Sequence, residues 1–155
     1  MARQKGSHRF LILLRGKGAG GVNQPPAGTH QLRAGIQNFR LPPGKAVSFG
    51  QSLYWAPEEM PDIARLKVLR PGLELGAPKK DRFEPAHALA LWLKGCAVVQ
   101  DFDPDSPQIA AFLHGDVVPS PKKGWCLVTS GGYSIGWGKG DGTVLKNHYP
   151  KGLRR

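Results

Sequence analysis

The stretch Trp125–Arg155, WCLVTSGGYSIGWGKGDGTVLKNHYPKGLRR, decides the fold of this chain. Three runs rich in β-branched and aromatic residues lie within it, at 125–129, 133–139 and 143–149. They are separated by Ser-Gly-Gly and Gly-Asp-Gly, which can supply the positive φ angles of tight hairpin turns. The pattern predicts an antiparallel meander of three strands that ends before Pro150.

The middle run of this meander alternates strictly between two kinds of residue. Tyr133, Ile135, Trp137 and Lys139 are predicted to share one face, and Ser134, Gly136 and Gly138 the other. Glycine inside a strand marks either a bulge or barrel corner, or a close approach by a ligand or another backbone. Both readings remain open from the sequence. For Trp137 itself, a place in the core is favoured.

The first 46 residues are the least able to form a core by themselves. Phe10–Leu14 is typical of a buried strand and is far too short to span a bilayer. The run Gly16–Gly21 matches the dinucleotide pattern G-x-G-x-x-G, but Pro25 and Pro26 follow where a helix would have to open. We therefore predict a Gly/Pro-rich linker rather than a cofactor loop, continuing through Leu41–Gly44.

Strand and helix signals alternate through the middle of the chain. Strands are predicted within 47–56, at Leu66–Leu69, after Gly72, at 97–100 and at Val117-Val118. A first helix is predicted over 85–94, starting at Pro85, with Ala86, Leu89, Trp92 and Leu93 as one apolar stripe. A second is predicted over 106–114, with Ser106 as its cap, Pro107 at its first position and Gly115 at its end. Together these strands and helices predict a small α+β pseudo-barrel.

The charge of the chain is high and unevenly distributed. The formal net charge is +11, and residues 1–57 contain no Asp or Glu. Residues 117–155 hold seven Lys and Arg against the single acid Asp141. Two basic ends predict a polyanionic partner, with nucleic acid first and an anionic membrane surface second. A basic surface without function is the remaining alternative. The absence of a targeting or membrane segment makes the cytoplasm the expected location.

Catalytic and metal-binding patterns are missing from the sequence. Cys96 and Cys126 have no metal spacing, and Cys126 is predicted to be a buried, inert thiol. The five histidines show no paired ligand spacing, and His87 is expected to be solvated or to cap a helix. We therefore predict that the chain alone is not an enzyme, that it holds no metal and that it binds no cofactor.

Cations and aromatic rings do cluster. Lys79, Lys80 and Arg82 occupy one loop, and further cations interleave with Tyr133, Trp137 and Tyr149 in the meander and tail. Cations neutralise phosphates and aromatic rings stack on unpaired bases, so the group favours RNA as the ligand. The alternative is that the rings are core and the cations are a solvated face.

Several motifs also resemble a known family. They are Leu66-Lys-Val-Leu-Arg-Pro-Gly-Leu-Glu-Leu-Gly76, the run 78–91, Gly136-Trp-Gly-Lys139 and Leu145-Lys-Asn-His-Tyr-Pro-Lys-Gly-Leu-Arg154. They resemble the C-terminal PUA-like RNA-binding domain of RsmF-type rRNA cytosine-C5 methyltransferases (the Sun/Fmu class). More weakly, Lys5–Leu14 resembles the last strand of that family's catalytic domain. The resemblance implies a basic strand plus linker over 1–46 and a PUA-like domain over 47–155.

The catalytic cysteine motifs and the cofactor loop of that family have no counterpart in this sequence. The family's catalytic domain binds S-adenosylmethionine and uses two cysteines, one after a proline and one after a threonine-proline pair. In this chain Cys96 follows Gly95 and Cys126 follows Trp125. The resemblance therefore implies the RNA-holding part of a methyltransferase, with S-adenosylmethionine required only if a separate methyltransferase domain is supplied elsewhere.

The expected partner is RNA, in particular ribosomal RNA, and no membrane is expected. A protein-docking module of a ribosome-associated complex is one alternative, and a methyltransferase with an unrecognised site is another. The basic loop and the tail are expected to form one surface, over which the glycine face of the middle strand admits a sugar–phosphate backbone. The predicted RNA-binding residues are Arg70, Lys79, Lys80, Arg82, Gly136, Gly138, Lys139, Lys146, His148, Tyr149, Lys151 and Arg154.

Overall fold

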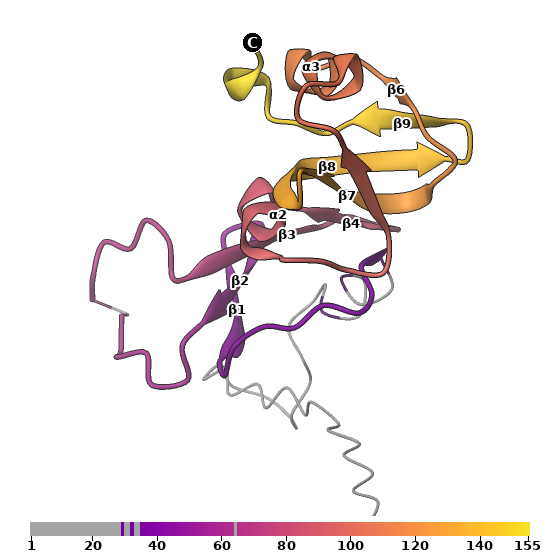
Figure 1. Ribbon diagram of the computed structural model, residues 1–155. Helices are drawn as coiled ribbons and strands as arrows, with labels where there is room; N and C mark the ends of the chain where they lie inside the picture. The colour runs from indigo at the N-terminus through magenta and orange to yellow at the C-terminus, as the bar shows by residue number, and fades with distance from the viewer. Residues whose placement is uncertain (1–28, 30–31, 33–34, 64) are drawn as a thin grey trace, which may run out of the picture.

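The computed structural model describes residues 29, 32, 35–63 and 65–155 (Figure 1). The predicted strand Phe10–Leu14 and the glycine run Gly16–Gly21 lie outside these residues. In the described part, two sheets pack with two short α-helices, and one of the sheets curls like part of a barrel. The predicted fold class, an α+β pseudo-barrel, is confirmed.

The first sheet has the strand order β1-β2-β3-β4, and all its pairs are antiparallel. Its strands are β1 (Lys45–Phe49), β2 (Ser52–Ala56), β3 (Leu73–Pro78) and β4 (Phe83–Pro85). The strand-rich run 47–56 is thus a hairpin, whose turn contains Gly50 at φ 60°. The strand predicted at Leu66–Leu69 is wrong. Both leucines are exposed in the loop between β2 and β3, because they have no neighbouring strand to pair with.

The second sheet has the strand order β5-β7-β8-β9-β6. Its strands are β5 (Val99–Phe102), β6 (Val118–Pro119), β7 (Lys123–Ser130), β8 (Tyr133–Asp141) and β9 (Val144–Asn147). β7, β8 and β9 pair antiparallel in sequence order, which confirms the predicted meander. β5 lies parallel to β7 at the edge of the sheet.

A register shift interrupts the alternation predicted for the middle strand. It falls between Val128 and Thr129 of β7, opposite the start of β8. Trp137 therefore packs on one side of the sheet, while Ile135 packs on the other side with Val128. The prediction that Ile135 and Trp137 share a face is wrong, since the added residue of a bulge reverses the side on which the following side chains lie.

The two helices lie close to their predicted places. α3 (Pro107–His114) begins after Ser106, whose side chain accepts a hydrogen bond from the Ile109 N–H, and ends at Gly115 in the left-handed conformation. α2 (His87–Trp92) is shorter than predicted, because Pro85 belongs to β4. Its buried residues are Leu89 and Ala90.

Trp92 does not belong to the buried stripe that was predicted for the first helix. Its side chain is about half exposed, as is that of Leu91. Leu93, which follows the helix, is buried in their place.

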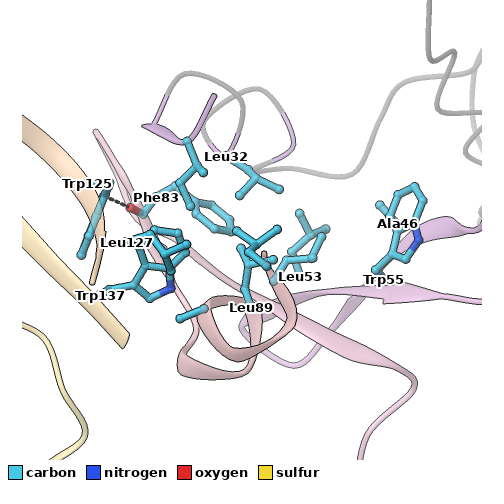
Figure 2. Packing of buried hydrophobic residues seen from close by; sticks show 13 residues of the cluster. Leu32, Ala46, Leu53, Trp55, Phe83, Leu89, Trp125, Leu127 and Trp137 are labelled. Carbon is cyan, nitrogen blue, oxygen red and sulfur yellow. Dashed lines mark hydrogen bonds between the residues drawn. The ribbon is translucent and has the colours of Figure 1, made fainter. Parts of the chain in front are cut away.

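The second sheet separates two apolar clusters. One contains Leu127 and Trp137 and fills the space between the two sheets and α2 (Figure 2). The other contains Cys126, Val128 and Leu145 and lies beneath α3. Leu32 and Ile36, which fall within the predicted linker, are buried in the first cluster. Among the described residues, no helix has the length and apolar character needed to cross a membrane.

Candidate nucleic-acid interface

Two tryptophans of the second sheet fix the end of the first sheet in place. The indole N–H of Trp125 in β7 donates to the Phe83 carbonyl at 2.9 Å (Figure 2). The indole N–H of Trp137 in β8 donates to the Ala86 carbonyl, also at 2.9 Å. The two rings meet edge to face with their centroids 6.5 Å apart. Residues 83–86 are therefore held directly against the meander.

Two basic side chains also pack against the ring of Trp125. The His148 imidazole lies edge to face against it with a centroid distance of 4.6 Å. The Lys139 ammonium lies 5.5 Å from the ring centroid, within cation–π range. Lys139 is the cross-strand partner of Trp125 on β8, and Lys146 is the partner of Lys139 on β9. Since directly opposed residues share a face, the three form a row across the sheet.

The β3–β4 hairpin brings further cations to the same place. Its turn is closed by a hydrogen bond from the Lys79 N–H to the Arg82 carbonyl, which leaves Lys80 and Asp81 exposed at the tip. Arg82 donates to a Glu84 carboxylate oxygen from Nε at 3.1 Å and from Nη2 at 3.0 Å. The Lys79 ammonium lies 3.9 Å from the other Glu84 oxygen.

Three of these charged side chains act on the pKa of His148. Partial burial lowers the pKa of its imidazole, nearby Glu84 acts to raise it, and Lys139 and Arg82 act to lower it. Arg82 and Glu84 from the hairpin and Lys139 from the meander thus all lie close enough to His148 to influence its pKa. We call this group of five residues the Trp125 cluster: Arg82, Glu84, Trp125, Lys139 and His148.

The predicted glycine face is not part of this surface. Gly136 and Gly138 are buried on the α3 side of the sheet. A Cβ on Gly138 would lie 2.5 Å from Cγ of Leu145, and a Cβ on Gly136 would lie 3.2 Å from Cδ2 of Tyr149. The expectation that this face is open to a sugar–phosphate backbone is wrong, because Leu145 and Tyr149 already cover it. Trp137, at 1% exposure, lies in the core as expected.

The tail residues of the predicted site lie around the end of α3. Arg154 donates to the Tyr149 carbonyl from Nε and Nη2, and its side chain passes over Gly115. The Tyr149 ring contacts His87 and Phe112. Lys151 is exposed in the short 3-10 helix η1 (Lys151–Leu153). The Tyr149 ring thus packs on the opposite side of the sheet from Trp125, apart from the basic loop 79–82.

Arg70 lies apart from both the Trp125 cluster and the tail residues near α3. It is exposed in the loop 57–72 between β2 and β3, which projects away from the second sheet (Figure 1). The structure thus gathers Lys79, Arg82, Lys139, Lys146 and His148 and leaves Arg70 apart. Whether any of these side chains binds RNA stays a prediction.

Two members of the Trp125 cluster were missed by sequence reasoning. Trp125 is predicted only as a strand residue, and pairing the hairpin outward from Ser130 and Tyr133 without the register shift would set it opposite Gly138 and not Lys139. Glu84 directly precedes Pro85, where the first helix is predicted to start, so the sequence predicts no strand at Glu84. Glu84 instead lies in β4, two residues after Arg82, and Arg82 donates two hydrogen bonds to its carboxylate.

Burial also shifts the pKa of Cys126 and that of His87, which lie outside the Trp125 cluster. Burial raises the pKa of the Cys126 thiol to about 11, as expected of an inert thiol. The prediction for His87 is wrong: its Nδ1 is buried without a hydrogen-bond partner in the described structure, and burial lowers its pKa. No group of three or more His, Cys, Asp or Glu side chains comes together there in a way that could hold a metal ion.

Two protein-family models match this chain in adjoining segments. Residues 32–93 match the first C-terminal domain of the RsmF rRNA methyltransferase. Residues 99–155 match the PUA domain of the methyltransferase RsmF. The first match ends just after α2, and the second begins at β5, so the Trp125 cluster takes residues from both. Residues 32–155 therefore belong to the family of C-terminal, PUA-containing regions of RsmF-type rRNA methyltransferases.

Proposed function

We propose that this region binds ribosomal RNA and positions it for a cytosine-C5 methyltransferase domain. The observation that carries the proposal is the Trp125 cluster with Lys79 and Lys146 beside it. Cations from the first matched segment and cations from the PUA segment lie next to one another there. A polyanion would bind such a surface more tightly than a single anion, because phosphates along one strand can contact cations from both segments.

The surface suits the backbone of RNA better than the edges of its bases. Lys79, Lys139 and Lys146 offer mobile point charges, and the Arg82 fork matches the geometry of a phosphate. Contacts of this kind set the position of a protein on a nucleic acid without specifying sequence. Tyr133 is 78% exposed at the turn between β7 and β8 and offers a ring for stacking on an unpaired base.

The chemistry of methylation is assigned to a separate domain in this proposal. Cys126 is buried with a raised pKa, so its thiolate is not available as a nucleophile. S-adenosylmethionine is then bound by the catalytic domain and not by residues 32–155. The purified chain incubated with labelled S-adenosylmethionine and rRNA should transfer no methyl group above a control without protein. The proposed place of action is the cytoplasm.

Charge reversal tests the RNA-binding surface. The double variant Lys79→Glu/Lys80→Glu should weaken binding to a fluorescein-labelled, structured rRNA fragment and flatten its salt dependence. Each lost phosphate contact reduces the slope of log K against log salt by about 0.7–0.9. The matched control is Arg65→Glu/Lys67→Glu, which makes the same charge change on exposed residues of the loop 57–72. Equal weakening by both variants would contradict the proposed location.

A second candidate function is docking to a protein. Leu91 and Trp92 on α2 are both about half exposed, and apolar side chains of this size favour a protein partner. Apolar docking loses little affinity when salt is raised. RNA affinity that stays flat between two salt concentrations would therefore favour this second candidate.

A further inference from the structure

Glu84 is the one acid within the Trp125 cluster, and its carboxylate is bound by the cations around it. One of its oxygens accepts from Nε and Nη2 of Arg82 at 3.1 and 3.0 Å. The other lies 3.9 Å from the Lys79 ammonium. The carboxylate thus faces a cation on each of its oxygens. This is the arrangement that a bound phosphate would show, with a protein side chain in its place.

We propose that Glu84 occupies an oxyanion site and competes there with an RNA phosphate, which must displace its carboxylate in order to bind. The inference rests on the proposed function. It adds that this phosphate site is filled by the protein itself while RNA is absent. The ligand class is a single phosphodiester group of an RNA backbone.

The cations around Glu84 outnumber its single negative charge, which favours the binding of a further anion such as an RNA phosphate. Lys79 and Arg82 belong to its own hairpin. Across from it, Lys139 and His148 belong to the meander, and Glu84 and His148 influence one another electrostatically. Two permanent cations, Lys79 and Arg82, therefore contact this single carboxylate, and a third, Lys139, belongs to the same cluster. Asp81, the other acid of the hairpin, lies at the exposed tip of the turn.

The exposure of the ion pair makes displacement feasible. The Arg82 side chain is 59% exposed and that of Glu84 is 38% exposed, so a phosphate can reach the guanidinium from solvent. Exposed ion pairs contribute little stability, so breaking this one costs little. The backbone of Glu84 is fixed by its pairing with Ala77, but rotation of the side chain can free the Arg82 fork.

The variant Glu84→Gln tests the competition, because it removes the negative charge and keeps nearly the same side-chain shape. Glu84→Gln keeps an oxygen that can accept from Arg82 but removes the charge that repels a phosphate. Two unit charges about 4 Å apart in water change an equilibrium constant about fivefold. We therefore expect Glu84→Gln to bind the labelled rRNA fragment about three- to tenfold more tightly than the parent at low salt. Its salt dependence should also be steeper.

The control removes an acid from another exposed contact, in which the Asp116 carboxylate lies 3.0 Å from Nδ1 of His114. Asp116 pairs with His114 beyond the end of α3, and Asp116→Asn gives the same change in net charge. If affinity depends on net charge alone, Asp116→Asn will gain as much as Glu84→Gln. A second control is the double variant Arg82→Ala/Glu84→Gln. Compared with Arg82→Ala, it should gain little, because the main donor to the oxyanion site has already been removed.

The outcomes separate this inference from the proposed function. Tighter binding by Glu84→Gln than by both the parent and Asp116→Asn supports the competition. Binding by the parent with no gain in Glu84→Gln, or with an equal gain in Asp116→Asn, overturns the competition alone. No RNA binding by the parent at any salt overturns the proposed function and the competition together. Thermal unfolding of Glu84→Gln within about 2 °C of the parent would show that the comparison is between equally folded proteins.

Discussion

Gly138 offers a direct test of how the meander is packed. The structure places Cγ, Cδ2 and Cδ1 of Leu145 at 2.5, 2.6 and 2.9 Å from the position of a Cβ on Gly138. Leu145 is fully buried beneath α3, so its side chain must press against its neighbours to make room. Gly138→Ala should therefore overpack the cluster and reduce the free energy of unfolding by about 1–3 kcal/mol.

The expected loss is large enough to measure by thermal denaturation. In a protein of this size, each kcal/mol lowers the melting temperature by about 2–4 °C. Gly152→Ala is the matched control, because a Cβ at Gly152 has no heavy atom within 4 Å. It should change stability by no more than about 1 kcal/mol in either direction. Folded Gly138→Ala should bind the rRNA fragment as the parent does, since its glycine face is covered.

A double-mutant cycle identifies the atoms responsible. Leu145→Ala alone should cost about 2–5 kcal/mol, because it leaves a cavity in a fully buried site. In Gly138→Ala/Leu145→Ala the added methyl group enters the space that Leu145 has left. The double variant should then be about as stable as Leu145→Ala alone. Strictly additive losses would refute this account of the packing.

Three further predictions concern titration, reactivity and capping. Burial lowers the pKa of His87 and of His148, so below about pH 6.5 the unfolded chain binds more protons than the folded chain. The free energy of unfolding, measured by urea titration, should therefore fall from pH 7.5 to 5.5. An equal fall in the variant His87→Gln/His148→Asn would contradict this origin. Cys126, with its raised pKa and full burial, should react with a thiol reagent at pH 8 only after denaturation, and stoichiometric labelling of the native protein would count against it. Ser106→Ala should cost about 0.5–2 kcal/mol through loss of the α3 cap, and unchanged stability would mean that the hydrogen bond to the Ile109 N–H contributes nothing.

The parts of the fold that were predictable depend on local signals. α3 was placed correctly because Ser106, Pro107 and Gly115 act on the backbone within one turn of where they stand. The meander was placed correctly because its turns carry glycines that the backbone requires, such as Gly131 and Gly132 at positive φ. Leu66–Leu69 failed because alternation of apolar and basic residues makes a strand only where a partner strand is present.

The surface was predictable only in part, because it depends on distant contacts. The sequence supplied its cations, and the expectation that Lys79 and Arg82 would join Lys139 and His148 agrees with the arrangement of the cluster. The sequence could not supply the register shift beside Val128, which decides which side of the sheet a residue occupies. Nor could it supply Leu145 and Tyr149 as the covering of the glycine face.

The two indole hydrogen bonds at Phe83 and Ala86 have a consequence for cooperativity. They tie the end of one family-matched segment to the centre of the other, and the shared apolar cluster continues across the same junction. Separating the two segments would remove the hydrogen-bond acceptors of both indole N–H groups and would expose both rings to solvent at the same time. The two segments should therefore unfold as a single unit, and amide protons on either side of the junction should exchange with solvent at matching free energies.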